Sequence, residues 1–330
     1  MNSFGRFFKT QIFGESHGVG AGIVIDGCPA GIELNDNMFE ADLSRRRAGA
    51  KGTTPRKEAD LPEIMSGFFN GKTTGAPLTI FFRNMNTRSG DYANLVASPR
   101  PGHADFTGKV KYGGFQDYRG GGHFSARLTV GVVAAGVVAK QILKNVEITA
   151  KVIEVGGTTD IDAALDKAIA EHNSIGGIVE CTVKGLPVGL GEPFWDSVES
   201  IISHAVFAIP ATKGIEFGSG FEAARMTGIE HNDNIIDEKG TTETNYAAGI
   251  NGGITNGNDI VFRIATKPTS SIAIPQKTMN FAKGKVDELV IKGRHDACVA
   301  LRVPPILEAV TAISLADLML LSQEAPRIQE

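Results

Sequence analysis

The sequence predicts an α+β protein in which antiparallel β-sheets pack against helices. Short β-branched runs indicate strands, and longer segments with helical periodicity lie between them without regular alternation. Several strand-like segments are followed by glycine-rich turns rather than crossover helices, which favours antiparallel pairing. The predicted strands span residues 22–26, 78–82, 178–183 and 259–264, and the predicted helices span 125–143, 161–171, 195–207 and 305–321.

Composition is that of an ordinary globular protein. The chain has 330 residues, 42% of them hydrophobic, which is enough for a large core, and no linker or repeat divides it, so we expect one domain over residues 1–330. A net charge of -4 argues against a nucleic-acid-binding protein and against a polybasic membrane anchor. The three cysteines have no metal-binding spacing, which predicts reduced thiols and no metal site.

The chain start shows no basic cap followed by an apolar stretch, so no signal peptide is predicted. The longest apolar run, 128–139, is too short to span a bilayer and is typical of a buried core helix. We therefore expect a cytoplasmic protein that does not contact membranes.

A histidine between glycines, in segment 14–18 (GESHG), lies in a loop before the first predicted strand. His17 can exchange a proton near neutral pH and would suit general acid catalysis on a leaving group, with the Ser16 hydroxyl beside it. A lone loop histidine is more often hydrogen-bonded to the backbone, so this motif needs support from others.

Segment 44–57 contains six basic residues and no acidic one, interleaved with glycine and threonine. Guanidinium groups bind carboxylate and phosphate in bidentate fashion, and the glycines are expected to let this loop close over a ligand. A solvated basic loop and an RNA contact are the alternatives. The acidic net charge and the absence of interleaved aromatic residues favour a small anion.

Three further segments suit anion binding and proton transfer. The glycine run 120–122 leads into a predicted helix start at Ser125, where exposed amides attract anions, although a capping serine after flexible glycines would look the same. Segment 267–271 combines a lysine with three hydroxyls but lacks the Walker glycine pattern. His103 and the Arg-His-Asp run 294–296 offer additional acids and bases.

Taken together, these motifs resemble the chorismate synthase family over nearly the whole chain. The order and spacing of segments 14–18, 45–47, 100–105, 117–122, 189–193, 267–271 and 292–296 agree with that family. The resemblance implies the last step of the shikimate pathway, in which 5-enolpyruvylshikimate 3-phosphate loses phosphate and a ring hydrogen by anti-1,4 elimination to give chorismate. It also implies reduced FMN with no net redox change, NADPH only as an indirect reductant, two antiparallel sheets sandwiched with helices, and a homotetramer.

The resemblance assigns catalytic roles to four residues. His17, with Ser16 beside it, matches the histidine that gives a proton to departing phosphate. His103 matches the histidine that keeps the reduced flavin correctly protonated, and Asp296 matches the acid that works with flavin N5.

Ligand contacts are carried over from the same motifs. The substrate has a phosphate and two carboxylates, and its expected contacts are Arg45, Arg46, Lys51 and Arg127. The expected FMN contacts are His123, Phe124, Ser125, Pro210, Ala211, Gly252, Lys267, Pro268, Thr269, Ser270, Ser271 and Arg294.

The chain departs from the family pattern in two places. Ala48 follows the arginine run where many relatives have proline. His123 and Phe124 stand where relatives often have arginine and serine, and His123 would replace that charge only when protonated.

Two other functions remain open on the residues alone. A phosphotransferase would use the basic segment and Lys267 for ATP, but no Walker or kinase signature supports it. An RNA-binding protein would use residues 45–57 and would bind with steep salt dependence.

Overall fold

The computed structural model describes residues 2–54, 58–87, 89–291 and 295–325. Five strands form the first sheet, in the order β1-β2-β3-β7-β4, and every neighbouring pair is antiparallel. At its centre Ile23 pairs with Ile12 on one side and with Ile80 on the other. Its strands are β1 (Ser3–Phe4), β2 (Lys9–Gly14), β3 (Gly20–Asp26), β4 (Glu63–Ser66) and β7 (Leu78–Arg83).

A second antiparallel sheet has four strands in the order β10-β13-β9-β8. Along β13, buried residues alternate with less buried ones, because successive side chains of a strand point to opposite faces. Buried Phe262 pairs with Cys181 and Phe217, so one face of this sheet contributes to the core. Its strands are β8 (Glu147–Val155), β9 (Gly177–Lys184), β10 (Thr212–Phe217) and β13 (Ile260–Thr266).

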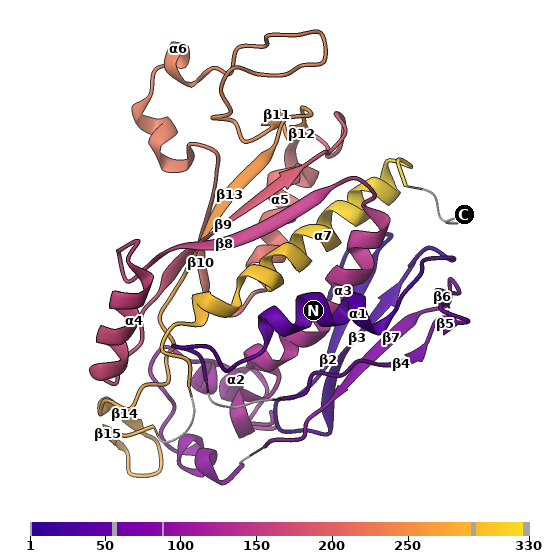
Figure 1. Cartoon of the computed structure of the whole chain (residues 1–330). Coiled ribbons are helices and arrows are strands. Elements are labelled where there is room, and N and C mark those ends of the chain that lie inside the picture. The colour runs from indigo at the N-terminus through magenta and orange to yellow at the C-terminus, as the bar shows by residue number, and fades with distance from the viewer. Residues whose placement is uncertain (1, 55–57, 88, 292–294, 326–330) are drawn as a thin grey trace.

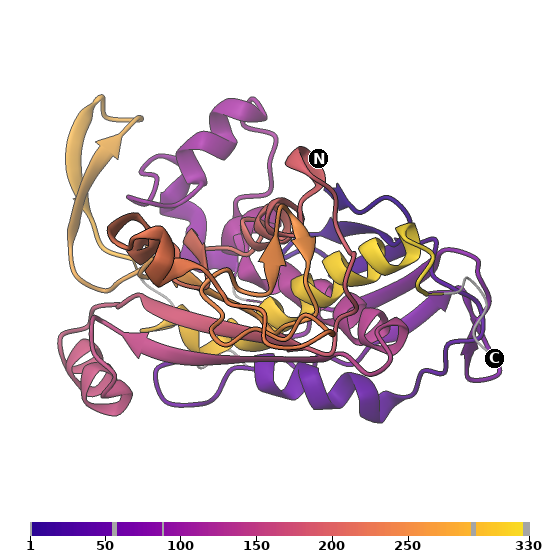
Figure 2. The same ribbon diagram turned by 90° about the horizontal axis from the view of Figure 1, so that it is seen from above.

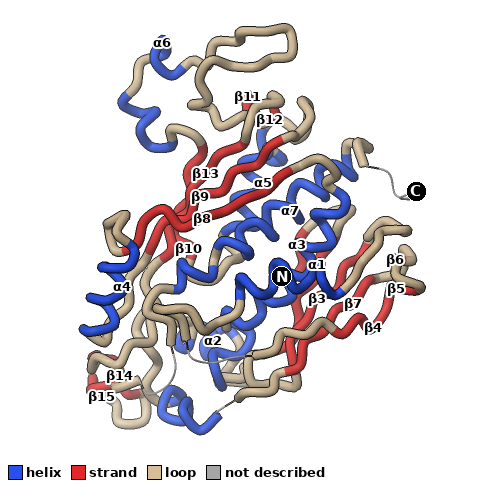
Figure 3. Tube along the Cα trace, viewed as in Figure 1, coloured by secondary structure: helices blue, strands red, loops and turns tan. Residues whose placement is uncertain are grey.

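Helices lie between the two sheets, as Figures 1 and 3 show. Helix α3 (Thr129–Ile142) packs on β3 and β7 of the first sheet, and α7 (Pro304–Leu321) packs on β8 and β9 of the second. The two helices also pack against each other, and a Cβ on Gly136 would lie 2.4 Å from the Cβ of Ala309. Only glycine allows this close approach. Helices α1 (Asp36–Arg46) and α5 (Val198–Val206) complete the layer.

Helix α7 is long and apolar enough to cross a membrane by length and composition, with a mean hydropathy of 1.5. It is 89% buried inside the protein, which is the position of a core helix. No other helix in the described ranges passes the same test.

Smaller elements surround this body, and Figure 2 shows the light-orange hairpin β14–β15 standing away from it. The remaining elements are α2 (Asp105–Lys111), α4 (Ile161–Ala170), α6 (Gly228–His231), and the hairpins β5 (Phe68–Phe69) with β6 (Lys72–Thr73), β11 (Ile250–Asn251) with β12 (Ile254–Thr255), and β14 (Gln276–Asn280) with β15 (Lys285–Leu289).

The predicted α+β class and antiparallel pairing are confirmed, and so are the four predicted strands and four predicted helices within a few residues. One expectation was wrong. Arg45 and Arg46 do not lie in a mobile loop, because they form the last turn of α1. The helix expected from Ser125 begins with a 3₁₀ turn (Ala126–Leu128), and α3 itself starts at Thr129.

Candidate active site

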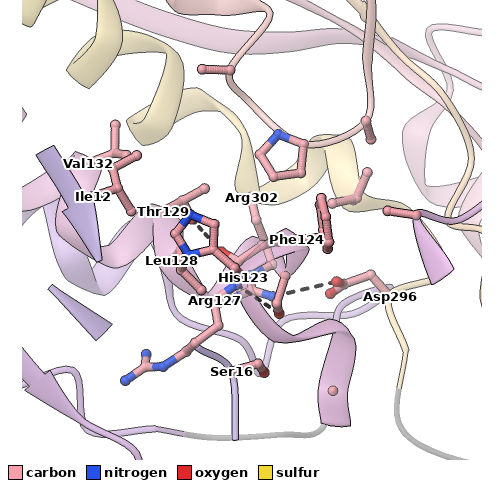
Figure 4. A pocket seen from close by; sticks show the side chains of 18 of the residues that line it. Ile12, Ser16, His123, Phe124, Arg127, Leu128, Thr129, Val132, Asp296 and Arg302 are labelled. Atoms are coloured by element: carbon pink, nitrogen blue, oxygen red, sulfur yellow. Dashed lines mark hydrogen bonds and ion pairs between the residues drawn. The ribbon is translucent and has the colours of Figure 1, made fainter. Parts of the chain in front are cut away.

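A cavity of about 670 Å³, a size usual for small-molecule sites, is lined by loops and by residues of β2, α3, α5 and α7. Figure 4 shows Ile12 and Val132 at one side of it and Phe124, Asp296 and Arg302 at the other. Most of the residues expected at the site line this cavity: Ser16, Arg46, His103, His123, Phe124, Ser125, Arg127, Pro210, Ala211, Lys267, Pro268, Thr269, Ser270, Ser271 and Asp296.

Three consecutive glycines bring the two proposed catalytic histidines together. Gly120, Gly121 and Gly122 all have positive φ, at 60°, 82° and 53°. A Cβ on Gly120 would lie 2.4 Å from Cδ2 of His17, and a Cβ on Gly121 would lie 3.4 Å from Cε1 of His103. The glycine backbone therefore passes against both imidazole rings, and no larger residue fits at Gly120 without moving His17.

His17 itself is buried beside the cavity rather than among its lining residues, with 8% of its surface exposed. Its ring meets the ring of Tyr92 edge to face, with centroids 5.2 Å apart, and Tyr92 does line the cavity. The loop that carries it is fixed by the Ser16 amide, which donates to the Gly122 carbonyl at 3.1 Å. His17 is thus held between Gly120 and Tyr92.

His103 is oriented by a buried carboxylate. Its Nδ1 lies 2.7 Å from Oδ1 of Asp105, so Nδ1 carries the proton and donates it. Arg100 donates to both oxygens of the same carboxylate at 2.7 Å, and its Nη2 lies only 3.0 Å from that protonated Nδ1 because both groups meet Asp105. Burial alone would raise the pKa of Asp105, but the hydrogen bonds from Arg100 and His103 hold it well below its usual range.

His123 links the glycine run to the first motif. Its Nδ1 lies 2.9 Å from the carbonyl oxygen of Gly14, the last residue of β2. Because a carbonyl only accepts, Nδ1 is the protonated nitrogen and Nε2 is left as an acceptor. A neutral His123 thus presents an acceptor to this site, where an arginine would present only donors.

Two arginines of the cavity wall share one carboxylate. Asp60 accepts from Nη1 of Arg46 at 2.8 Å through Oδ2 and from Nη1 of Arg127 through Oδ1. Burial lowers the pKa of Arg46 to about 9, against the opposing effect of Asp60, so the guanidinium stays charged at neutral pH.

The segment after β13 forms the wall next to His103. Nζ of Lys267 donates to the carbonyl of Gly102 and lies 3.1 Å from Oγ of Ser270, while Nη1 of Arg100 donates to Oγ of Ser271 at 3.0 Å. Burial and the nearby Lys213 lower the pKa of Lys267. This cation therefore lies at the cavity with only part of its hydration.

The same segment meets Ala211, whose φ of 73° is rare for a residue with a side chain. The carbonyl of Ala211 accepts from the Lys267 amide at 2.9 Å. Such a conformation costs about 1 kcal/mol and persists where the surroundings fix it, often at ligand sites.

Asp296 also lines the cavity. Its Oδ1 accepts from the Thr54 amide at 2.8 Å, and its Oδ2 lies 3.5 Å from Nη1 of Arg302. The Asp296 side chain is 13% exposed and lines the cavity.

Four residues expected at the site lie elsewhere in the structure or outside its described part. Arg45 forms a bidentate pair with Glu308, at 2.6 and 2.8 Å, and Lys51 pairs with Asp166 at the surface. Gly252 lies in the turn between β11 and β12 and does not line the cavity. Arg294 falls outside the described residues.

Sequence reasoning missed several lining residues, notably Asp60, Tyr92 and Arg302. None of them stands in a motif whose local composition indicates chemistry. Asp60 has a positive φ of 51°, which aspartate tolerates better than most residues, but the sequence gives no sign of this conformation.

Comparison with known proteins identifies the family of this chain. The chorismate synthase family model matches residues 8–320. A chorismate synthase from Chitinophaga pinensis is 62% identical over 329 residues, covering 99% of both chains, and one from Dehalococcoides mccartyi is 43% identical over 359 residues, also covering 99% of both. A crystal structure of a chorismate synthase superposes with a TM-score of 0.72 at 27% identity and covers 96% of this chain and 93% of that one. The chain therefore belongs to the chorismate synthase family.

Proposed function

We propose that this cavity is where the chain carries out the chorismate synthase reaction, with the residues described above in distinct roles. The reaction removes phosphate and a ring hydrogen from 5-enolpyruvylshikimate 3-phosphate in an anti-1,4 elimination and gives chorismate. The observation that carries the proposal is the packing of His17 and His103 against one glycine run, at a cavity whose walls also hold Arg46, Arg127 and Lys267.

The cavity fits a flavin with a phosphate tail. Oγ1 of Thr269 is buried at the cavity wall without a hydrogen-bond partner within the described residues, as expected of a hydroxyl that a ligand completes. Lys267 beside it supplies a cation, and Ser270 and Ser271 supply further hydroxyls. When bound here, reduced FMN would supply electron density to the substrate ring without net redox change.

The protein's own groups handle charge and protons. Buried Arg127 and partly buried Lys267 offer donors to the phosphate and carboxylates of the substrate, and cations shielded from water bind anions more strongly because water competes less. His17 gives a proton to the departing phosphate, which lowers the charge that develops on it.

His103 acts on the flavin side of the reaction. Because Asp105 accepts from Nδ1, the ring keeps one orientation and presents Nε2 toward Gly121. Asp296, fixed by the Thr54 amide, is the acid that works with flavin N5.

An anaerobic assay tests these roles. With reduced FMN and the enolpyruvyl substrate, the protein should release phosphate and form chorismate in equal amounts. His17→Ala and His103→Ala should each lower kcat by about 100-fold or more and leave FMN affinity nearly unchanged. His172→Asn is the matched control, because His172 is exposed in the turn after α4 and asparagine tolerates its positive φ of 54°.

Two results would refute the proposal. Chorismate formation without any flavin would show that the reaction does not need this cofactor. Unchanged kcat in both histidine variants would show that neither histidine is catalytic.

The finer family properties belong to the same proposal. They are the β-α-β sandwich as a single domain and a homotetramer in the cytoplasm. The packing of α3 and α7 between two antiparallel sheets supports the first of these. A molar mass about four times 34.9 kDa in light scattering is the result expected for the tetramer.

A further inference from the structure

We propose that Asp60 is a positioning residue that sets how Arg127 meets the anionic substrate, with Arg46 as its buried support. The inference rests on the proposed function, because it concerns binding of the phosphorylated substrate in this cavity. It gives different roles to two arginines that look equivalent in the sequence.

The first argument is the position of the carboxylate. Asp60 lines the cavity, yet its side chain is only 2% exposed, and each of its oxygens meets a different guanidinium. Oδ2 accepts from Arg46 at 2.8 Å and Oδ1 accepts from Arg127. A carboxylate used in this way holds the two cations at a fixed distance from each other.

The second argument is the use of the donors on Arg46. Its Nε donates to Thr129 Oγ1 at 3.0 Å, and its Nη2 donates to the carbonyls of Ala126 and Arg127 at 3.2 and 3.0 Å. With Asp60 on Nη1, four of its five N–H groups are engaged within the described residues. Arg46 therefore directs most of its donors at the protein and supports its neighbour.

Arg127 is held more loosely. Its Nε donates to Oδ1 of Asn84 at 3.0 Å, its Nη2 reaches the carbonyl of Arg83 at 3.3 Å, and its Nη1 meets Asp60. Two of its five N–H groups have no acceptor within the described residues, so they remain for a ligand. The structure thus separates a supporting arginine from a contacting one.

The third argument is charge. The two guanidiniums and one carboxylate carry a net charge of +1 in a site with little water. Without the carboxylate, two buried like charges would repel each other, and Arg127 would leave the orientation that Asp60 now fixes. A flexible cation binds an anion less tightly than a fixed one because ordering it lowers the affinity.

Asp60→Asn is the variant that isolates charge. Asparagine accepts the positive φ of Asp60 as readily as aspartate does, so the backbone should stay as it is. The anaerobic assay with reduced FMN should show KM for the enolpyruvyl substrate raised about tenfold or more with kcat within about threefold, the pattern expected when ground state and transition state lose the same contact. Inhibition by inorganic phosphate should weaken in parallel.

Two comparisons separate positioning from a merely structural role. Asp317→Asn is the matched control, since Asp317 is a buried carboxylate that binds the backbone amides of Arg6, Phe7 and Phe8 away from the cavity. Asp317→Asn should lower Tm and leave KM for the substrate unchanged. In an Arg127→Ala background, Asp60→Asn should raise KM no further, because its effect passes through Arg127.

An unchanged KM for Asp60→Asn would overturn the proposal, and so would tighter substrate binding, which would make Asp60 a competitor of the substrate. An equal further rise of KM in the Arg127→Ala background would overturn it as well. If the wild-type protein forms no chorismate, the proposed function fails instead, and calorimetric binding of inorganic phosphate to wild type and Asp60→Asn still decides the role of Asp60.

Discussion

Replacing Gly120 with alanine gives the sharpest test of the site geometry. The new Cβ would lie 2.4 Å from Cδ2 and 2.5 Å from Nε2 of His17, whereas ordinary contacts begin near 3.4 Å. The imidazole must therefore retreat by about 1 Å, and a misplacement of that size costs on the order of 100-fold in rate. Anaerobic chorismate formation should show this loss in kcat.

The substitution also strains the backbone, so a control is needed. Gly120 has φ of 60°, where an alanine costs about 1–2 kcal/mol. Gly284 has a similar φ of 66° in the β14–β15 hairpin, and a Cβ there meets nothing within 4 Å. Gly284→Ala should lose similar stability and keep its activity. A folded Gly120→Ala protein with kcat within threefold of wild type would refute the placement of His17 against this glycine.

Three further predictions follow from the core. Asp317→Asn should lower the free energy of unfolding by about 3 kcal/mol, because three backbone amides lose a charged acceptor, and urea denaturation measures it. Burial raises the pKa of Glu308, but Arg45, Lys140 and the Ala150 amide outweigh burial and hold the pKa below its usual value of 4.5. The ionised Glu308 therefore stabilises the protein above pH 4.5, and this stabilisation is lost as the pH falls through the lowered pKa. Glu308→Gln should therefore destabilise the protein at pH 7 by about 3–5 kcal/mol and flatten its loss of stability in acid; an unchanged acid slope would contradict this. Burial raises the pKa of Cys28 to about 12 and also raises the pKa of the buried thiols of Cys181 and Cys298, so an alkylating reagent at pH 8 should label none of the three until the protein is unfolded.

Several of the larger elements of the fold could be predicted because the pattern of their residues matches the structure that they form. Strand β13 has a β-branched alternating pattern, and helix α7 has a long apolar run that begins with two prolines at its first turn. Helix α1 was missed because only Phe39, Leu43 and Arg46 are buried along it, and a mostly polar helix shows little periodicity. Strand β10 was missed because the glycine at its third position interrupts the strand pattern.

The site was predictable as a set of segments but not as a set of contacts. Arg45 and Arg46 are adjacent in sequence, and their side chains leave α1 about 100° apart. Arg46 therefore reaches the cavity while Arg45 reaches Glu308 in the core. No local pattern distinguishes them, because the partner of each lies far away along the chain. The same holds for Asp60, whose importance appears only when α1 and the turn before α3 bring two cations to it.

The charges of this cavity bear on how it could bind an anion. The five arginines of its described wall all have carboxylate partners: Arg46 and Arg127 share Asp60, Arg100 holds Asp105, Arg302 lies near Asp296, and Arg47 binds Glu40. At these arginines an anionic substrate therefore meets fixed N–H groups whose positive charge is partly neutralised. The favourable free energy of anion binding comes from the orientation of these groups, because they were already ordered and desolvated when the chain folded. A carboxylate in such a wall is then part of the binding site, and its removal should weaken anion binding although it adds positive charge.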